Sequence, residues 1–140
     1  MVLKLPCYGA TMRQAARAIS QEYDRVLAPL NLTTTQFTLL RTLGQRPGAR
    51  VNDLAEALAM DQTTASRTLA LVKKAGLIKR QLGEDRRESR WMLTAAGSEK
   101  LRKGLPLWEG AQRRVDALLE PGEAARLKSA VFRLTEKLVG

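Results

Sequence analysis

The fold is decided by residues 51–97, which read VNDLAEALAMDQTTASRTLALVKKAGLIKRQLGEDRRESRWMLTAAG. The segment from Val51 to Met60 has the apolar spacing of a short helix. Asp61 then offers an N-cap for a second helix, which Gly76 ends as the residue beyond its C-cap. Two short helices joined by a tight turn form a helix-turn-helix, and this motif is the first prediction.

The sequence pattern changes immediately after Gly76. Leu77–Arg80 and Ser89–Leu93 have the composition of two short strands, with a polar tip over Gly83–Arg87 between them. The sequence therefore predicts a β-hairpin that directly follows the helix-turn-helix.

Helices are also predicted on the N-terminal side of the motif. Apolar residues recur at helical spacing from Ala10 to Leu27, and Pro29 stops that helix. Another helix begins near Thr34, where neighbouring threonines supply N-cap hydroxyls, and it ends at Gly44 and the turn over 46–48.

Two more helices are predicted after the hairpin. Thr94 caps a long helix, and Pro106 inside its apolar pattern is expected to bend or divide it. The last helix is expected to start at Pro121, because proline is favoured at the first helical position. The chain is thus expected to be mainly α and to form one domain over residues 1–140.

Composition excludes several classes of protein. The 140 residues include 24 Lys and Arg, 14 Asp and Glu, one Cys and no His, for a net charge of +10. Without histidine, a Ser-His-Asp or Cys-His catalytic set is excluded, and neither a metal site nor a cofactor is expected. Gly44 and Gly48 lack the Gly-Lys-Ser/Thr of a phosphate-binding loop, so an enzyme is not expected. No apolar run reaches membrane-spanning length and no signal-peptide pattern is present, which predicts a cytoplasmic protein without a membrane partner.

Positive charge is concentrated in one part of the chain. Residues 62–90 carry eight cations and three anions, half of the net charge in about a fifth of the length. A strongly basic chain is suited to a polyanionic partner such as nucleic acid. The alternative, on composition alone, is an inert basic surface.

The second helix of the motif has an unusual polar face. Small polar side chains with one cation fit closely into the major groove of double-stranded DNA and offer donors to base edges and phosphates. The face consists of Gln62, Thr63, Thr64, Ser66, Arg67 and Ala70, and the expected phosphate contacts nearby are Lys73 and Lys74. The alternative is an ordinary exposed face, although threonine and serine have low helix propensity and are unusual choices there.

Six short motifs, in order along the chain, resemble the multiple antibiotic resistance regulator (MarR) family. They are Leu32-Thr33, Gln36-Phe37, Leu54-Ala55, Gly76-Leu77-Ile78, Asp85-Arg86-Arg87 and Leu93-Thr94-Ala95-Ala96-Gly97. The resemblance implies a winged helix-turn-helix in which the short hairpin is the wing. It also implies a homodimer that binds a pseudo-palindromic DNA operator, usually as a repressor released by a small aromatic ligand or an oxidant. Residues 1–30 and 98–140 would be the dimerisation helices, and residues 31–97 the DNA-binding lobe.

The resemblance also assigns roles to individual residues. The residues that match the groove-reading helix are Thr63, Thr64, Ser66 and Arg67. Arg87 matches the wing arginine that enters the minor groove, and Arg86 shares the tip role. Asp85 and Arg80 match a pair that braces the base of the wing.

Two sensing hypotheses complete the interpretation. Cys7 lies near the place where organic-hydroperoxide regulators of this family carry a sensing cysteine, and a cation such as Arg13 would lower its pKa. The alternative is that Cys7 is a small packing residue. The second hypothesis is a pocket for an aromatic acid, whose candidate residues are Tyr8, Arg13, Arg17, Tyr23 and Trp108; its alternative is core or interface packing.

A rival function also fits the basic winged helix. Such a module also binds RNA or a protein partner without operator specificity, and it would show no preference for a palindromic duplex.

Overall fold

The computed structural model describes residues 1–82 and 89–140 of the chain. Its elements in chain order are α1 (Tyr8–Leu27), η1 (Ala28–Leu30), α2 (Thr34–Gln45), α3 (Val51–Ala57), α4 (Gln62–Lys74), β1 (Ile78–Leu82), β2 (Ser89–Leu93), α5 (Ala95–Asp116) and α6 (Glu123–Val139). The strands form one antiparallel hairpin in which Ile78 pairs with Leu93 and Leu82 with Ser89. The expected mainly α winged helix-turn-helix is confirmed.

One lobe holds most of the hydrophobic core. It contains α2, α3, α4 and the hairpin, which surround buried side chains that include Phe37, Leu40, Leu54, Leu69 and Trp91. These residues recur at helical spacing in α2 to α4, and Trp91 lies on the inner face of β2. The recognition motif is therefore carried by a packed unit.

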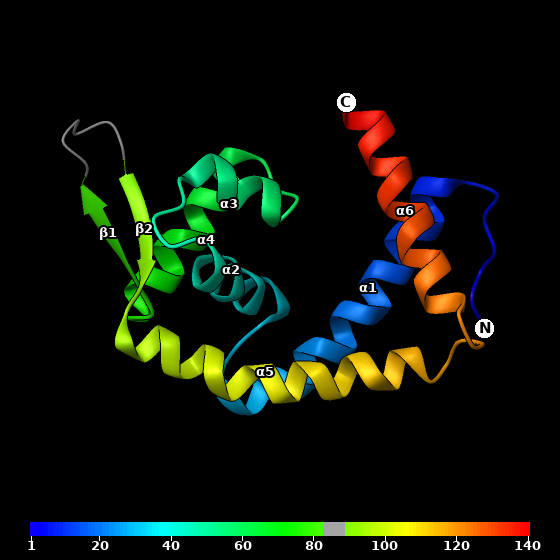
Figure 1. Cartoon of the computed structure of the whole chain (residues 1–140), viewed down its shortest axis with the longest axis horizontal. Helices are drawn as coiled ribbons and strands as arrows, with labels where there is room; N and C mark the ends of the chain where they lie inside the picture. Colours follow the sequence, from blue (N-terminus) through cyan, green and yellow to red (C-terminus); the bar gives the residue numbers. More distant parts are fainter. Residues whose placement is uncertain (83–88) are drawn as a thin grey trace.

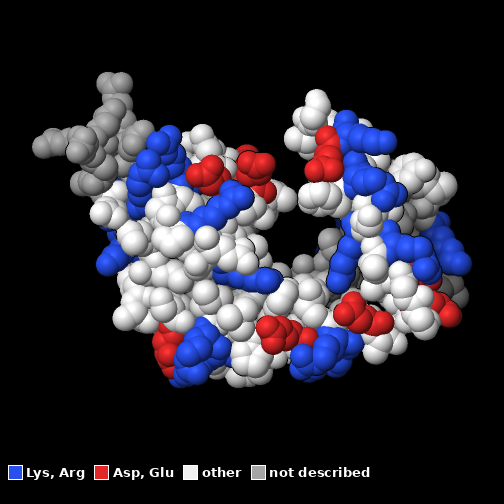
Figure 2. All heavy atoms as spheres, in the orientation of Figure 1, with Lys and Arg blue, Asp and Glu red and all other residues white. Residues whose placement is uncertain are grey.

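A long helix joins this lobe to the two ends of the chain. Figure 1 shows α5 running from the hairpin to the opposite side of the molecule, where α1 and α6 lie. α5 packs against both α1 and α2. In the space-filling view, an open gap separates the lobe from α6 (Figure 2). No residue of α6 is buried in the single chain.

The predicted helix N-caps are confirmed. The Thr33 side chain accepts a hydrogen bond from the N–H of Gln36. The Asp61 side chain accepts a hydrogen bond from the N–H of Thr64. The Thr94 hydroxyl accepts from the N–H of Gly97 at the start of α5. These caps are local in sequence, which explains why the residue types alone revealed them.

One proline-based expectation is settled in part and another needs correction. Pro106 does not divide the long helix, because α5 continues through it, and the expected bend stays a prediction. Pro106 is exposed, which leaves the carbonyl that loses its backbone partner accessible to solvent. The last helix starts at Glu123 instead of Pro121, because Gly122 has a left-handed φ of 79° and completes the turn first. Among the described residues, no helix is long and apolar enough to cross a membrane.

Candidate nucleic-acid interface

The outer face of α4 forms an open, shallow hollow. It is lined by Gln62, Thr63, Ser66, Arg67 and Ala70. The opposite face is buried in the lobe through Ala65, Leu69 and Val72. The packing thus turns the whole polar face outward, and within the described residues no ion pair engages Arg67.

The two ends of α4 differ in charge. At the N-terminus, the Asp61 carboxylate accepts a hydrogen bond of 2.7 Å from the N–H of Thr64. Hydrogen bonding from Thr64 holds the pKa of Asp61 below its ordinary value. At the C-terminus, Lys73 and Lys74 are exposed in the last turn. The lysines stand beside the polar face, in positions suited to the phosphates that flank a groove.

The base of the hairpin is anchored to the lobe. Trp91 forms a backbone bridge to Ala49, and the Arg90 guanidinium donates to the Gly48 carbonyl at 3.2 Å. Arg80 lies opposite Trp91 in the register and is exposed. The remaining wing assignments fall on Asp85, Arg86 and Arg87, which lie outside the described residues, as does the brace from Asp85 to Arg80.

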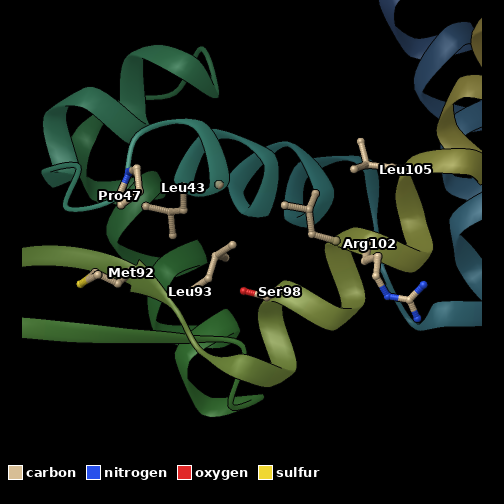
Figure 3. Close-up of a pocket in the computed structure, with 9 residues that line it drawn as sticks. Leu43, Pro47, Met92, Leu93, Ser98, Arg102 and Leu105 are labelled. Carbon is tan, nitrogen blue, oxygen red and sulfur yellow. The ribbon is translucent and has the colours of Figure 1, made fainter.

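A second hollow lies at the base of the hairpin, where α2, β2 and α5 meet. Its volume is about 430 Å³, and its walls are mostly apolar. Figure 3 shows Ser98 and Arg102 on the α5 side, opposite Leu43 and Pro47 from the α2 side. Arg102 is held by Glu99 at 2.6 Å. Sequence reasoning missed this hollow, because it forms only where three elements distant in sequence come together.

The proposed aromatic-acid residues do not come together in one chain. Tyr23 donates a hydrogen bond to Gln112, and its ring centroid lies 6.4 Å from that of Trp108. Tyr8 is instead exposed at the other end of α1, where it lines a surface hollow with Cys7. Tyr23 thus contacts Trp108 while Tyr8 lies apart from them, and the aromatic-acid pocket stays a prediction. Arg13 and Arg17 are exposed along α1.

A cation that sequence reasoning missed contacts Trp108. The Arg41 guanidinium lies 4.1 Å from the Trp108 ring centroid, as expected for a cation–π contact. Arg41 is one turn beyond Phe37, whose ring also packs on Trp108 with centroids 5.9 Å apart. In the sequence, Phe37 and Arg41 lie four residues apart in α2 and therefore share one helix face. Their common contact with Trp108 depends on where α5 lies, so the sequence alone did not reveal it.

Cys7 is exposed and occupies the N-cap position of α1 without a side-chain capping bond. It is separated from Tyr23 by most of α1, a distance of about 24 Å at helical rise. Within one chain the pairing of Cys7 with that tyrosine is thus absent, and redox sensing stays a prediction.

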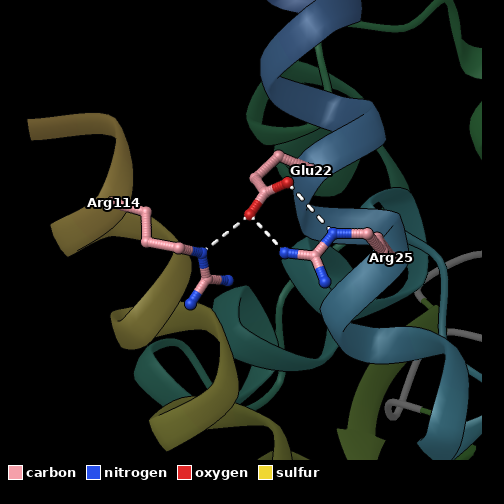
Figure 4. Close-up of polar contacts among 3 residues, drawn as sticks. All are labelled: Glu22, Arg25 and Arg114. Atoms are coloured by element: carbon pink, nitrogen blue, oxygen red, sulfur yellow. Dashed lines mark hydrogen bonds and ion pairs between the residues drawn. The ribbon is translucent and has the colours of Figure 1, made fainter. Parts of the chain in front are cut away.

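Three charged residues connect α1 to the far half of α5. Glu22 accepts hydrogen bonds from Arg25 at 2.7 Å and from Arg114 at 2.8 Å, as Figure 4 shows. The hydrogen bonds from Arg25 and Arg114 lower the pKa of Glu22 to about 2. Together with the bond between Tyr23 and Gln112, this pairing fixes the crossing of the two helices.

Comparisons with known proteins agree with this geometry. A sequence profile of the MarR family matches residues 30–88. The transcriptional regulator MosR of M. tuberculosis, solved in complex with DNA, is 34% identical, with a TM-score of 0.80 over 94% of this chain and 98% of that chain. AbsC of Streptomyces coelicolor, a MarR family transcriptional regulator, is 26% identical, with a TM-score of 0.83 over 100% of this chain and 99% of that one. The HTH-type regulator YwoH of Bacillus subtilis is 27% identical over 89 residues, which are 64% of this chain and 65% of that relative.

Proposed function

Because the chain belongs to the MarR family of transcriptional regulators, we propose that it is a homodimer that represses transcription from a pseudo-palindromic operator. It is a sequence-specific DNA-binding regulator of the winged-helix class. The observation that carries the proposal is the outward polar face of α4, which presents Thr63, Ser66 and Arg67 on a packed helix. This role assigns no catalysis to the chain, and it fits the cytoplasmic location expected from the sequence.

Each part of the α4 face has a role in this proposal. Thr63, Ser66 and Arg67 meet base edges in the major groove, because they combine short reach with one long donor. Gln62 and Thr64 flank them at the first turn. Lys73 and Lys74 contact phosphates and set the affinity for any sequence.

The wing completes the interface on each side. We assign Arg87 to the minor groove, with Arg86 beside it, because a guanidinium loses its hydration more readily than an ammonium and favours a narrow A·T-rich groove. Arg80 and Asp85 brace the wing base in this assignment.

The homodimer is supported by the terminal helices. α6 exposes a stripe of Leu127, Val131, Leu134 and Leu138, and it has no buried residue of its own. A stripe of this kind on a long helix requires a partner surface. A second copy of the chain covers it in our proposal and places two α4 helices about one turn of DNA apart.

Release from DNA is assigned to an inducer that binds the dimer in a conformation unsuited to the operator. Such a molecule shifts the population only as far as its affinities for the two states differ. The candidate triggers are a small aromatic molecule near Tyr23 and Trp108, or an oxidant at Cys7.

Selection of bound sequences tests the proposal. Duplexes enriched from a random pool by the purified protein should contain two half-sites related by two-fold symmetry. They should bind at least about a thousandfold more tightly than scrambled duplexes at physiological salt. Enrichment without symmetry, or equal binding to RNA of the same sequence, would instead support the basic module without operator specificity. Repeating the selection with hydroperoxide or aromatic acids identifies the class of inducer.

A further inference from the structure

The end of the recognition helix and the start of α5 are joined through one side chain. Thr94 donates its hydroxyl hydrogen to the Gly76 carbonyl at 2.6 Å, just past the end of α4. The same hydroxyl oxygen accepts from the N–H of Gly97 at 3.1 Å and so caps α5. The Thr94 backbone N–H donates to the Leu77 carbonyl at 3.0 Å. One residue thus connects the last turn before the wing to the first turn after it.

Gly97 lets the two segments approach closely. A Cβ at this position would lie 1.9 Å from the Leu77 carbonyl oxygen, which is far inside any van der Waals contact. Gly97 is also buried. Any side chain here would push the first turn of α5 away from the segment that leaves α4. We call the contact of Gly76 and Leu77 with Thr94 and Gly97 the α4–α5 junction.

The junction lies at the N-terminal end of α5, so a small change in the direction of this helix is amplified at its far end. α5 has 22 residues and is therefore about 33 Å long. A change of about 5° in its direction moves its far end by about 3 Å, close to the 3.4 Å rise between adjacent base pairs. The far end is fixed to α1 by Glu22 and Arg114, in the region assigned to the dimer.

We propose that Thr94 and Gly97 are positioning residues that set the distance between the two recognition helices, and hence the half-site spacing that the dimer accepts. The inference rests on the proposed function, because it requires a dimer that binds two half-sites. Neither residue needs to touch DNA. A rigid junction makes one spacing favourable, whereas a loose junction lets the dimer adapt to several spacings at a lower affinity for the best one.

Thr94→Asp removes the hydrogen bond to the Gly76 carbonyl but keeps the N-cap of α5. Aspartate accepts the Gly97 N–H as well as threonine does, but an ionised carboxylate has no proton to donate to the Gly76 carbonyl. Thr94→Ser keeps both bonds. Ala95→Asp adds the same charge one residue away at an exposed position and serves as the matched control.

The experiment measures affinity for a duplex selected with the wild-type protein and for versions with its spacer lengthened or shortened by one base pair. For Thr94→Asp, the ratio of affinities between the best and the altered spacers should fall at least about threefold, while base preference within each half-site is unchanged. Thr94→Ser and Ala95→Asp should keep the wild-type ratio. An equal ratio in Thr94→Asp and Ala95→Asp overturns the inference.

Two further measurements keep the outcome decisive. Gly97→Ala should move the preferred spacing by displacing α5, and an unchanged preference in a folded variant counts against the junction. In variants that remain folded, spin labels at Lys74→Cys in a Cys7→Ser background report the distance between subunits without DNA. Thr94→Asp should broaden that distance distribution, and equal widths overturn the inference. Failure of the wild-type protein to dimerise or to select half-sites refutes the proposed function instead.

Discussion

Arg67 is the residue whose side chain carries most of the expected base readout. Arg67→Ala should lower affinity for a selected operator by about 1–3 kcal/mol for each half-site and relax the preference at one position in each half-site. Lys73→Ala should weaken all duplexes alike and reduce the slope of log K against log salt by about 2, because the dimer loses one phosphate contact in each subunit. Titrations with the operator and with random DNA at several salt concentrations distinguish the two effects.

The control for this comparison is Arg102→Ala. It removes an equally exposed arginine from α5, paired with Glu99 and away from the α4 face. Equal losses on operator and random DNA for Arg67→Ala would make Arg67 a phosphate contact.

Ala59 carries backbone strain in the turn of the helix-turn-helix. Its φ of 52° lies in the left-handed region, which costs an L-residue about 1–2 kcal/mol but costs glycine little. Ala59→Gly should therefore raise the free energy of unfolding by about 0.5–1 kcal/mol after the entropy of glycine is counted. Gly76→Ala, at a φ of 80°, should lower it by about 1 kcal/mol. Urea unfolding measures both, and a stability loss in Ala59→Gly would contradict the strain.

Local chemistry at single residues was predictable from the sequence. The caps at Thr33, Asp61 and Thr94 depend on residues three positions away, and all three are present. The left-handed Ala59 was not predictable, since alanine gives no sign of such a φ and the tight turn between α3 and α4 imposes it.

At the scale of elements, the crossing of α1 and α5 depends on pH through Glu22. Its pKa is lowered from 4.5 to about 2 by the hydrogen bonds from Arg25 and Arg114. A carboxyl group with a lowered pKa in the folded state stabilises it fully above its ordinary pKa, and loses that contribution as pH falls toward the folded value. The loss due to Glu22 therefore falls between about pH 5 and pH 2.

Glu22→Gln tests this dependence. Its urea unfolding midpoint should fall less than that of the wild type between pH 5 and pH 3, because the substitution removes the titrating group. Glu109→Gln is the control, since Glu109 is exposed on α5 and has no ion pair among the described residues. Identical pH dependence in all three proteins would show that the Glu22 pairing adds no stability to the crossing.

The sequence predicted the kinds of elements better than their ends. Periodicity and turn residues identified every helix of the lobe and the hairpin, because those signals are local. Pro121 misled because the left-handed Gly122 completes the turn before α6 begins. Pro106 marks an interrupted backbone bond, but α5 continues through it.

At the scale of the whole molecule, the dimer is the central expectation. Sedimentation at tens of micromolar should give twice the 15.5 kDa of one chain. Leu134→Glu, on the apolar stripe of α6, should raise the dimer dissociation constant by at least about a hundredfold, because the charge enters the interface twice.

Ser129→Glu provides the matched control for that change. Ser129 lies on the opposite, polar face of α6, where an added charge stays in water. Equal dissociation of the two variants, or a wild-type protein that sediments as a monomer, would contradict the assigned interface and the palindromic operator with it.

Arrangement across the molecule was the least predictable part of the candidate site. The polar face of α4 was visible in the sequence, because one helix determines it. The hollow beside Leu43 and Ser98, and the contact of Arg41 with Trp108, depend on where α5 crosses α2. Tyr8 and Tyr23 lie at opposite ends of α1 with different neighbours, and the aromatic-acid pocket that would join them stays a prediction.

The unburied α6 has a consequence for how operator binding would depend on the number of chains in the cell. In the proposed homodimer, α6 is covered only when two chains associate, so a single chain supplies one recognition helix and cannot bind a complete operator. At concentrations well below the dimer dissociation constant, the number of dimers grows with the square of the number of chains. Doubling the gene dose would then quadruple the number of dimers, and halving it would leave a quarter. Dimerisation through α6 would thus make the regulated genes respond to copy number more sharply than a monomeric regulator allows.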